Sequence, residues 1–308
     1  MKIGVVLVTF NRLADLKKTI RLYEQQSHKP AYILAVDNHS TDGTAEFLAQ
    51  WMAEESDVEH KLITLAENTG GSGGFYAGTK AAAELAADWI WLADDDAYIE
   101  PDAFEKFRDF LACGAVPEKD VAALSAAVCN KSGYSNSHRS RNEKTLFGYS
   151  KRSVADDEYQ KAYFEIDYYS FVGALIKKDV LIKAGFPEKG YFIYHDDYEH
   201  AERVRKYGKI LCIPEAKVFH EDNSNATREA SWRDYYATRN LLLLYKKHYG
   251  NSAFYRKAVT RFLSSCLSMN PEKIRLFWVS IQDANKEVTG LHSIYRPGWQ
   301  PTKKYPKK

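Results

Sequence analysis

The sequence lacks the features that define several large protein classes. Its four cysteines are far apart and form no CxxC pair, which excludes a cysteine-based zinc site and a disulfide framework. No apolar stretch reaches the ~18 residues of a membrane-spanning helix. The short apolar run after Met1 is not followed by the small-residue cleavage site of a secretory signal. We therefore expect a cytoplasmic protein with buried thiols.

Charge of one sign is also missing. The 43 Lys and Arg residues nearly balance the 41 Asp and Glu residues, so the net charge of +2 gives no reason to expect a nucleic acid partner. Any anionic ligand must then be bound by a local arrangement of groups. With 308 residues and 45% hydrophobic content, the chain can form one large domain or a nucleotide domain with an extension.

The most informative stretch is DWIWLADDD at residues 88–96. Its apolar part predicts a strand buried on both faces, and Asp94, Asp95 and Asp96 follow it directly. Ligands of open α/β sheets bind beyond the carboxyl ends of the strands. If the extended backbone continues, Asp94 and Asp96 point the same way and form half of a site for a hard cation, completed by water and substrate phosphates. The alternatives are a solvated acidic loop or a helix cap.

Two further strands are predicted to end at the same edge of a parallel sheet. Residues 3–9 form a continuous apolar run, a helical pattern follows at 13–23, and residues 32–36 form the next strand. A right-handed βαβ connection then brings Asp37 near the acid triplet. Asp37 suits a hydrogen bond to an N–H or hydroxyl group of a bound nucleotide. Alternatively, Asp37 and Ser40 cap the helix predicted over 44–52.

A glycine-rich stretch follows the strand predicted at 62–65. Four glycines between Gly70 and Gly74 precede an alanine-rich helix at 77–87, so we expect a loop with unhindered backbone at a helix N-terminus. A diphosphate can approach such a loop closely and meets the positive end of the helix dipole. A flexible turn without a ligand is the alternative.

Acidic and histidine residues also follow the later apolar segments. Asp196 and Asp197 precede a helix that ends at Gly208, where they either serve a site or cap the helix. His220 follows strands predicted at 209–213 and 217–219 and is a candidate to complete the cation site. The alternative for His220 is a structural role.

The remaining segments are less distinctive. Residues 131–160 are polar without a clear period, and we expect an irregular excursion near the active face, such as a mobile lid. Residues 191–194 suggest an aromatic strand or turn. Helices are predicted at 232–249, 254–267 and 274–281, with apolar faces and basic rims that could pack on the domain, self-associate or contact a membrane surface. The basic tail PTKKYPKK is expected to be disordered.

Six motifs in order carry a family resemblance. They are VTFNR at 8–12, VDNHSTDGT at 36–44, ENTGGSGGF at 67–75, DDD at 94–96, HDDYEHAERVRKYG at 195–208 and VFH at 218–220. Together they resemble family 2 glycosyltransferases of the GT-A fold, in particular the branch with rhamnosyl- and galactofuranosyltransferases. The resemblance implies a Rossmann-like, open and mostly parallel α/β sheet flanked by helices over residues 1–230. A C-terminal helical extension with a basic tail would occupy residues 231–308.

The resemblance also implies roles for individual residues. Asp94, Asp96 and His220 would hold Mn²⁺ or Mg²⁺, and Asp197, with Asp196 beside it, would supply the catalytic base. The nucleotide-sugar donor would be bound by Thr9, Phe10, Arg12, Asp37, Asn68, Gly70, Gly71, Gly74, Asp94 and Asp95. The implied reaction is inverting transfer from a UDP-galactofuranose or dTDP-rhamnose type of donor to a hydroxyl of a glycan or lipid-linked glycan. HDD replaces the more usual ED of rhamnosyltransferases, so the donor sugar stays open.

Two other functions fit parts of the sequence. A sugar nucleotidyltransferase also binds nucleotide and metal on an α/β sheet, but it should have a glycine-rich, basic loop after the first strand, where this chain has only Asn11 and Arg12. A non-catalytic nucleotide-sugar sensor would bind without turnover, and the sequence contains no recognisable output module.

Overall fold

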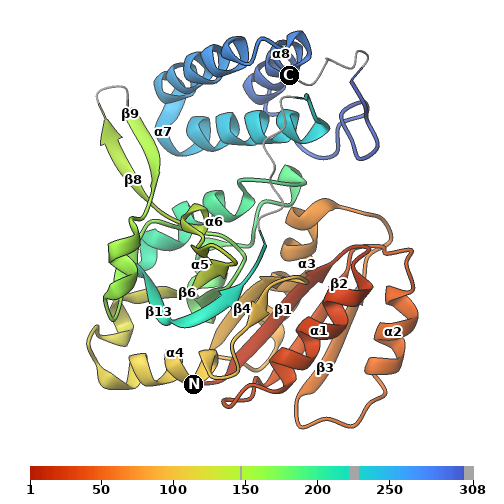
Figure 1. Ribbon diagram of the computed structural model, residues 1–308, viewed down its shortest axis with the longest axis vertical. Helices are drawn as coiled ribbons and strands as arrows, with labels where there is room; N and C mark the ends of the chain where they lie inside the picture. Colours follow the sequence, from red (N-terminus) through yellow and green to blue (C-terminus); the bar gives the residue numbers. More distant parts are fainter. Residues whose placement is uncertain (146–147, 222–228, 302–308) are drawn as a thin grey trace.

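The computed structural model describes residues 1–145, 148–221 and 229–301 (Figure 1). The predicted basic tail falls outside them, apart from Pro301. The main sheet contains the strands β1 (Ile3–Thr9), β2 (Tyr32–Asp37), β3 (Glu59–Thr64), β4 (Trp89–Asp94), β5 (Tyr98–Ile99), β6 (Val121–Asn130), β7 (Gly133–Tyr134), β10 (Phe164–Ile166), β12 (Ala174–Lys177) and β13 (Lys209–Phe219). The helices are α1 (Leu13–Glu24), α2 (Thr44–Trp51), α3 (Gly70–Glu84), α4 (Ala103–Cys113), α5 (Lys178–Ala184), α6 (Asp196–Val204), α7 (Trp232–Leu267) and α8 (Pro271–Asn285).

The main sheet is mixed and mostly parallel. Its strand order is β10-β13-β6-β12-β4-β1-β2-β3, with β5 paired to β13 and β7 paired to β6. The run β4-β1-β2-β3 is parallel, as is the β13-β6 pair, while β12 lies antiparallel between β4 and β6. Parallel strands need crossover connections, and α1, α2 and α3 supply them. The predicted α/β sheet flanked by helices is confirmed.

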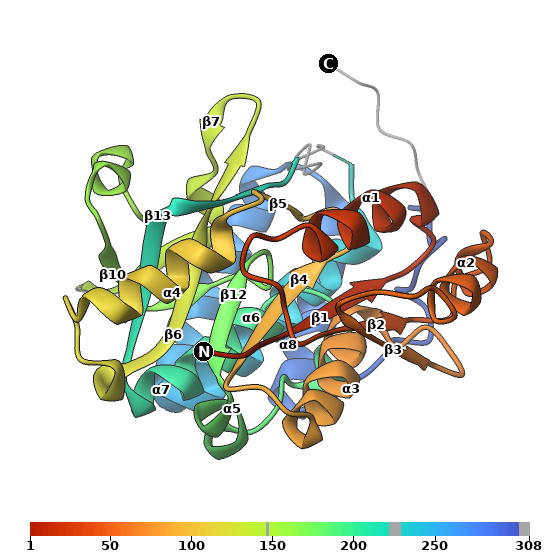
Figure 2. The same cartoon turned by 90° about the horizontal axis from the view of Figure 1, so that it is seen from below.

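Alternation along β1 explains the two layers of helices. Ile3, Val5 and Leu7 belong to one buried cluster, which contains the inward faces of α1, α2 and α4. Val6 and Val8 point to the other side, into a cluster formed with α3, α5 and α6. Figure 2 shows α1 and α4 on one side of the strands and α3 and α5 on the other. Because both faces are covered, the functional groups gather where the strands end.

The glycine-rich stretch is helical, which corrects the prediction of a loop before the helix. Gly70 is the first residue of α3, and the following glycines form its first turns. A Cβ at Gly74 would lie 2.4 Å from Val8 Cγ1, and one at Gly78 would lie 2.4 Å from Val6 Cγ1. Glycine at these positions therefore lets α3 lie directly against β1, and this packing compensates for its low helix propensity.

Residues 131–160 are more ordered than predicted. The strands β8 (Arg139–Thr145) and β9 (Gly148–Ser153) form a hairpin, and β11 (Tyr168–Tyr169) joins β8 to complete a second, three-stranded sheet. The 3₁₀ helices η2 (Asn136–His138) and η3 (Asp156–Gln160) flank the hairpin. The prediction of an irregular segment was wrong, because these strands are polar on both faces and give no apolar period.

Smaller differences concern strand limits and thiols. Residues 209–219 form one strand with an irregularity between Ile213 and Lys217, where two strands were predicted. The segment predicted as an aromatic strand or turn begins as the 3₁₀ helix η4 (Lys189–Tyr191). Cys129 and Cys212 are buried, but Cys113 is exposed and Cys266 is partly exposed, so the prediction of buried thiols holds only for two of the four.

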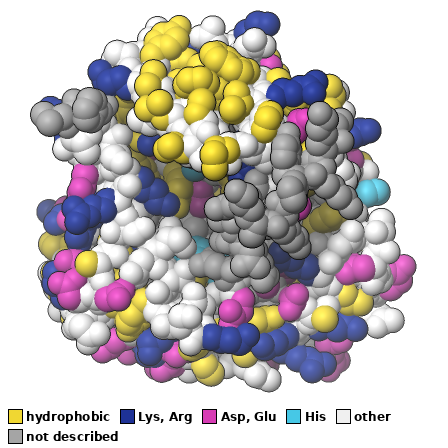
Figure 3. All heavy atoms as spheres, turned by 45° about the horizontal axis from the view of Figure 1, so that its top comes forward, with side chains coloured by type: hydrophobic (Ala, Val, Ile, Leu, Met, Phe, Trp, Pro, Cys, Tyr) yellow, Lys and Arg dark blue, Asp and Glu magenta, His cyan; other side chains and the backbone are white. Residues whose placement is uncertain are grey.

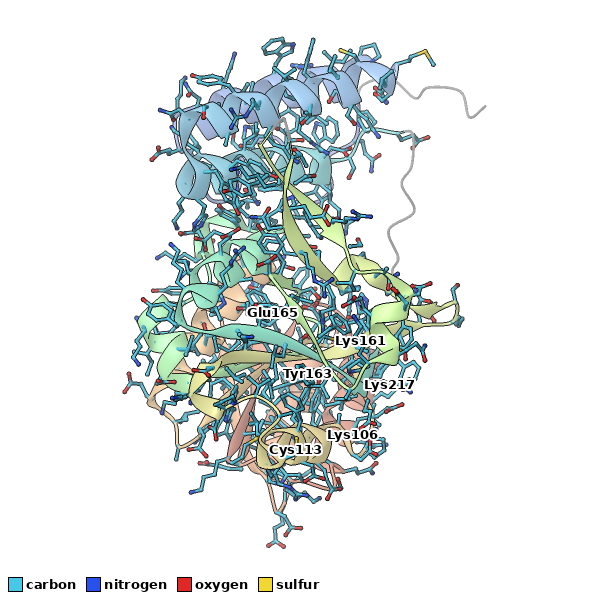
Figure 4. All side chains as sticks on the ribbon, turned by 90° about the vertical axis from the view of Figure 1, so that its left-hand side faces the viewer. Lys106, Cys113, Lys161, Tyr163, Glu165 and Lys217 are labelled. Carbon is cyan, nitrogen blue, oxygen red and sulfur yellow. The ribbon has the colours of Figure 1, made fainter. Side chains whose placement is uncertain are left out.

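The C-terminal helices form a separate layer at one end of the molecule (Figure 1). The long helix α7 is broken at Gly250, whose φ is +81°, and α8 packs beside it. In Figure 4 this pair lies at the end opposite α4, on which Lys106 and Cys113 are labelled. Within the described residues, no helix combines the length and hydropathy needed to cross a membrane.

Candidate functional site

The carboxyl ends of three parallel strands define the site. Thr9 at the end of β1 lies opposite Asp37 at the end of β2, and Val8 lies opposite Asp94 at the end of β4. Asp37 is almost fully buried, and its Oδ1 accepts a hydrogen bond of 2.9 Å from the backbone N–H of Ser40. The strand register therefore brings Thr9, Asp37 and Asp94 to one edge of the sheet, as the sequence predicted.

Asp96 and His220 meet through a pairing that the sequence does not reveal. Asp94 and Asp96 were predicted to point the same way because the strand would continue through them. The strand β4 ends at Asp94, so strand alternation is not what brings these two aspartates together. Instead the chain turns into β5, whose Tyr98 pairs with Phe219 of β13. This pairing brings Asp96 beside His220, with 3.4 Å between Asp96 Oδ1 and His220 Nε2.

Asp94, Asp96 and His220 form a candidate metal centre. Each offers a ligand atom, and these atoms all lie within 4.8 Å of one another. Burial and the neighbouring charge of Asp96 raise the pKa of Asp94 to about 8. Burial also opposes ionisation of Asp96, but the hydrogen bond and charge of His220 lower the pKa of Asp96 below its usual value. Two crowded carboxylates and an imidazole fit a divalent cation such as Mn²⁺, which would relieve the repulsion between them.

Asp95 points into the protein, unlike its neighbours. It is 3% exposed, and its carboxylate accepts hydrogen bonds from Thr9 Oγ1 at 2.7 Å, Phe10 N at 3.4 Å and Arg12 at 3.2 Å. The guanidinium of Arg12 also pairs with Asp96. Asp95 thus ties the end of β1 to the turn after β4 and fixes Arg12 at the edge of the acidic group.

The beginning of α3 is held against the same edge. The Asn38 amide donates to the carbonyl of Gly70 at 2.9 Å and to Asn68 Oδ1 at 3.2 Å. Gly70 has a φ of +72°, and a Cβ there would lie 2.0 Å from the Phe192 carbonyl oxygen, so no other residue fits. At Gly71, by contrast, a Cβ would meet nothing within 4 Å. Of the three glycines predicted to bind the donor, only Gly71 therefore adjoins open space.

Asp196 and Asp197 begin α6, next to α3 and the hairpin. Burial, followed by the charge of Asp197, raises the pKa of Asp196 to about 7, and the adjacent Ser72 opposes this shift. Burial also raises the pKa of Asp197 to about 7, which the charge of Lys151 opposes. Asp196 is buried, whereas Asp197 is partly exposed. A carboxyl with a pKa near 7 can accept a proton at neutral pH.

Contacts through η2 link Tyr198, the neighbour of Asp197, to the metal centre. The Tyr198 hydroxyl and Lys151 Nζ each donate to the carbonyl of Ser137 at 3.2 Å. The next residue, His138, packs edge-on against His220, with 5.4 Å between the ring centroids. Figure 3 shows a hollow on this side of the molecule in which acidic and histidine side chains are visible.

Several residues at the site were not identified from sequence. Asn38 and Ser72 lie within the motifs VDNHSTDGT and ENTGGSGGF, so motif membership was the available signal. Lys151 and His138 fall in the polar segment without a period, and nothing in that segment marks them.

The fold and the family match define the class of protein. Residues 4–185 match the family described as Glycosyl transferase family 2. This match covers more than half of the chain, and the chain belongs to that family. Its structural neighbours are glycosyltransferases of the GT-A fold, which confirms the predicted fold class.

The similarity to individual proteins is lower in sequence than in fold. Galactofuranosyltransferase GlfT1 of Mycobacterium tuberculosis is 27% identical over 203 residues, which is 66% of this chain and 64% of that protein's length. The structure of GalNAc-T7 with UDP, GalNAc and Mn²⁺ superposes with a TM-score of 0.64 at 13% identity, covering 93% of this chain and 56% of that one. TarS 1-349 of S. aureus with UDP-GlcNAc gives a TM-score of 0.59 at 14% identity, covering 94% and 82% of the two chains.

Proposed function

We propose that the protein is an inverting, metal-dependent hexosyltransferase that uses a nucleoside-diphosphate sugar of the UDP-galactofuranose or dTDP-rhamnose type. The acceptor would be a hydroxyl of a glycan or lipid-linked glycan, in the assembly of a cell-surface polysaccharide on the cytoplasmic side of a membrane. Residues 1–230 would carry the reaction, and residues 231–308 would form an accessory helical extension. The observation that carries the proposal is that Asp37, Asp94, Asp96 and His220 lie at one sheet edge, which η2 links to Tyr198, the neighbour of Asp197.

The donor would lie across the carboxyl ends of β1, β2 and β4. Asp37 would accept hydrogen bonds from the base, Thr9, Phe10 and Arg12 would line the nucleotide pocket, and Asn68 would support the start of α3. The diphosphate would pass Gly71, where the backbone adjoins open space and the positive end of the α3 dipole favours negative charge. The galactofuranosyltransferase relative and the nucleotide-bound neighbours support this class of donor.

Asp94, Asp96 and His220 would hold the cation. When bound, Mn²⁺ or Mg²⁺ supplies positive charge that stabilises the leaving diphosphate. The Arg12 guanidinium, now paired with Asp95 and Asp96, lies where it can add to that charge. The cation and the Arg12 guanidinium would both act by charge alone, without a proton transfer.

The acceptor hydroxyl must lose its proton as it attacks the anomeric carbon from the face opposite the diphosphate. Asp197 is the proposed base, since it is partly exposed and carries a pKa near the operating range. Asp196 is buried beside Ser72, where it would support the position of Asp197.

The test is a screen of UDP- and dTDP-sugars with Mn²⁺, followed by the Asp197→Asn variant. Loss of the base should slow transfer by roughly 10²–10⁴-fold while metal-dependent nucleotide binding stays within a few fold. Asp179→Asn on α5, which removes a carboxylate of an exposed ion pair, is the control and should be fully active. Comparable transfer by Asp197→Asn and wild type would remove Asp197 as the base. Pyrophosphate release would indicate a nucleotidyltransferase, and binding of every donor without turnover would indicate a sensor.

A further inference from the structure

The outer face of the C-terminal helix pair carries apolar side chains that the protein itself does not cover. Tyr255, Val259, Leu263 and Leu267 recur every fourth residue along the second half of α7 and are 57%, 57%, 55% and 82% exposed. Met269 is 82% exposed, and Trp278 of α8 is 50% exposed. We call these six residues the apolar patch. Figure 3 shows hydrophobic side chains gathered on this end of the molecule, beside the hollow that contains acidic and histidine side chains.

The patch is additional to the helix pair's own core. Phe254 and Ala258 on the opposite side of α7 are buried against Phe277 of α8. The aromatic rings of Phe262 and Trp278 lie 5.5 Å apart, which makes the exposed parts of α7 and α8 one continuous surface. The second half of α7 is therefore apolar on two faces, and its outer face has no partner among the described residues. The outer face of such a helix is expected to contact another protein or a membrane.

The charges around the patch indicate which of these partners it fits. Residues 251–281 contain five basic residues and one acidic residue, Glu272. The basic residues are Arg256, Lys257, Arg261, Lys273 and Arg275. Arg261 donates a hydrogen bond to Thr238 Oγ1 and Lys257 lies over the Tyr245 ring, so these two face the protein, whereas Arg256 and Arg275 are exposed. We call Arg256 and Arg275 the basic rim. A helix with an apolar face and basic flanks lies in the interface of a bilayer with anionic headgroups. A second copy of this chain fits less well, because a two-fold interface would set the same basic rim against itself.

We propose that the apolar patch and its basic rim bind the surface of an anionic lipid bilayer. The occupant is the interfacial region of the membrane, with the patch side chains among the acyl chains and the basic residues among the headgroups. Because the patch borders the hollow in Figure 3, that hollow would open beside the lipid surface. This proposal does not depend on the reaction, since it concerns attachment alone.

The experiment is vesicle flotation of the full chain, with phosphatidylcholine alone or mixed with phosphatidylglycerol. We expect wild type to bind the anionic vesicles, and added salt to weaken binding. Leu263→Gln with Leu267→Gln should reduce binding on the order of a hundredfold, because two leucines leave the apolar phase. Arg256→Gln with Arg275→Gln should reduce binding to the anionic vesicles by roughly 25-fold, about fivefold for each lost charge.

The matched control replaces two exposed apolar residues elsewhere, Met52→Gln near α2 and Ile182→Gln on α5, which are 40% and 51% exposed. This variant should bind as wild type does. The proposal is overturned if wild type does not bind anionic vesicles, or if the control loses as much binding as the patch variant. It is also overturned if light scattering shows a wild-type dimer that Leu263→Gln and Leu267→Gln convert to monomer. No step measures catalysis, so failure here leaves the proposed reaction untouched.

Discussion

Gly71 and Gly74 occupy neighbouring turns of one helix, and the structure assigns them opposite responses to the same substitution. A methyl group at Gly74 would lie 2.4 Å from Val8 Cγ1, which is about 1 Å closer than ordinary contact. Either α3 moves away from β1 or Val8 leaves its rotamer. Overpacking of this kind costs about 2 kcal/mol, so for a chain of 308 residues we expect Gly74→Ala to lower Tm by ~3 °C.

At Gly71 the same methyl group meets nothing within 4 Å. Alanine favours the helix and restricts the unfolded chain, so Gly71→Ala should raise the free energy of unfolding by about 0.4–1 kcal/mol. If the diphosphate passes over this backbone, the methyl group occupies its path. Loss of one hydrogen bond to a charged group weakens binding by roughly tenfold to a hundredfold.

Thermal unfolding and calorimetric titration with UDP and Mn²⁺ check both variants, and each serves as the control for the other. We expect Gly71→Ala to be stable and weak in UDP binding, and Gly74→Ala to be unstable but close to wild type in binding at low temperature. Wild-type affinity in a folded Gly71→Ala would refute the path of the diphosphate. Wild-type stability of Gly74→Ala would refute the packing argument.

Three further predictions address other groups of the site. Lys151→Met removes a positive charge that lowers the pKa of Asp197. The acidic limb of the pH-rate profile, expected near pH 7, should therefore move upward by about one pH unit. An unchanged limb would show that Lys151 does not influence the pKa of Asp197. Asp96→Ala should abolish the Mn²⁺ dependence of UDP affinity in titrations, and retained dependence would remove Asp96 from the metal centre. Glu199→Gln should lower the free energy of unfolding by about 3–5 kcal/mol in urea, because it leaves the charge of Arg203 uncompensated in a buried pair. Burial opposes ionisation of Glu199, but its hydrogen bonds hold its pKa below the usual value. The stability that ionised Glu199 contributes is therefore complete above pH ~4.5 and is lost as pH falls. A stability difference between wild type and Glu199→Gln that does not change with pH would contradict this.

The sequence predicted the parts of the site that depend on buried strands. β1, β2 and β4 are short apolar runs, and their ends at Thr9, Asp37 and Asp94 follow from where apolar residues stop. Parallel pairing then requires those ends to share an edge. The two helices predicted at 232–249 and 254–267 correspond to the two halves of α7, which is broken at Gly250.

The parts that depend on pairing between distant polar segments could not be predicted. The hairpin of β8 and β9 carries no apolar alternation, and its strands are fixed by each other and by α7. Tyr245 of α7 donates to the carbonyl of Tyr149, and Asn142 of β8 donates to Tyr249. Lys151 lies over the ring of Tyr198, next to Asp197, only because this hairpin forms, so the sequence gives no sign of its effect on Asp197.

The acid triplet shows how one motif divides its residues between structure and chemistry. An unbroken strand would point Asp95 away from Asp94 and Asp96. In the structure the chain turns after Asp94, and Asp95 still points away from the other two carboxylates. Asp95 binds the buried Thr9 and the exposed Arg12, while Asp94 and Asp96 remain beside His220. Replacing Asp95 should therefore disturb both the β1 end and Arg12 at once. Asp95 thus stabilises the sheet edge at which Asp94 and Asp96 lie.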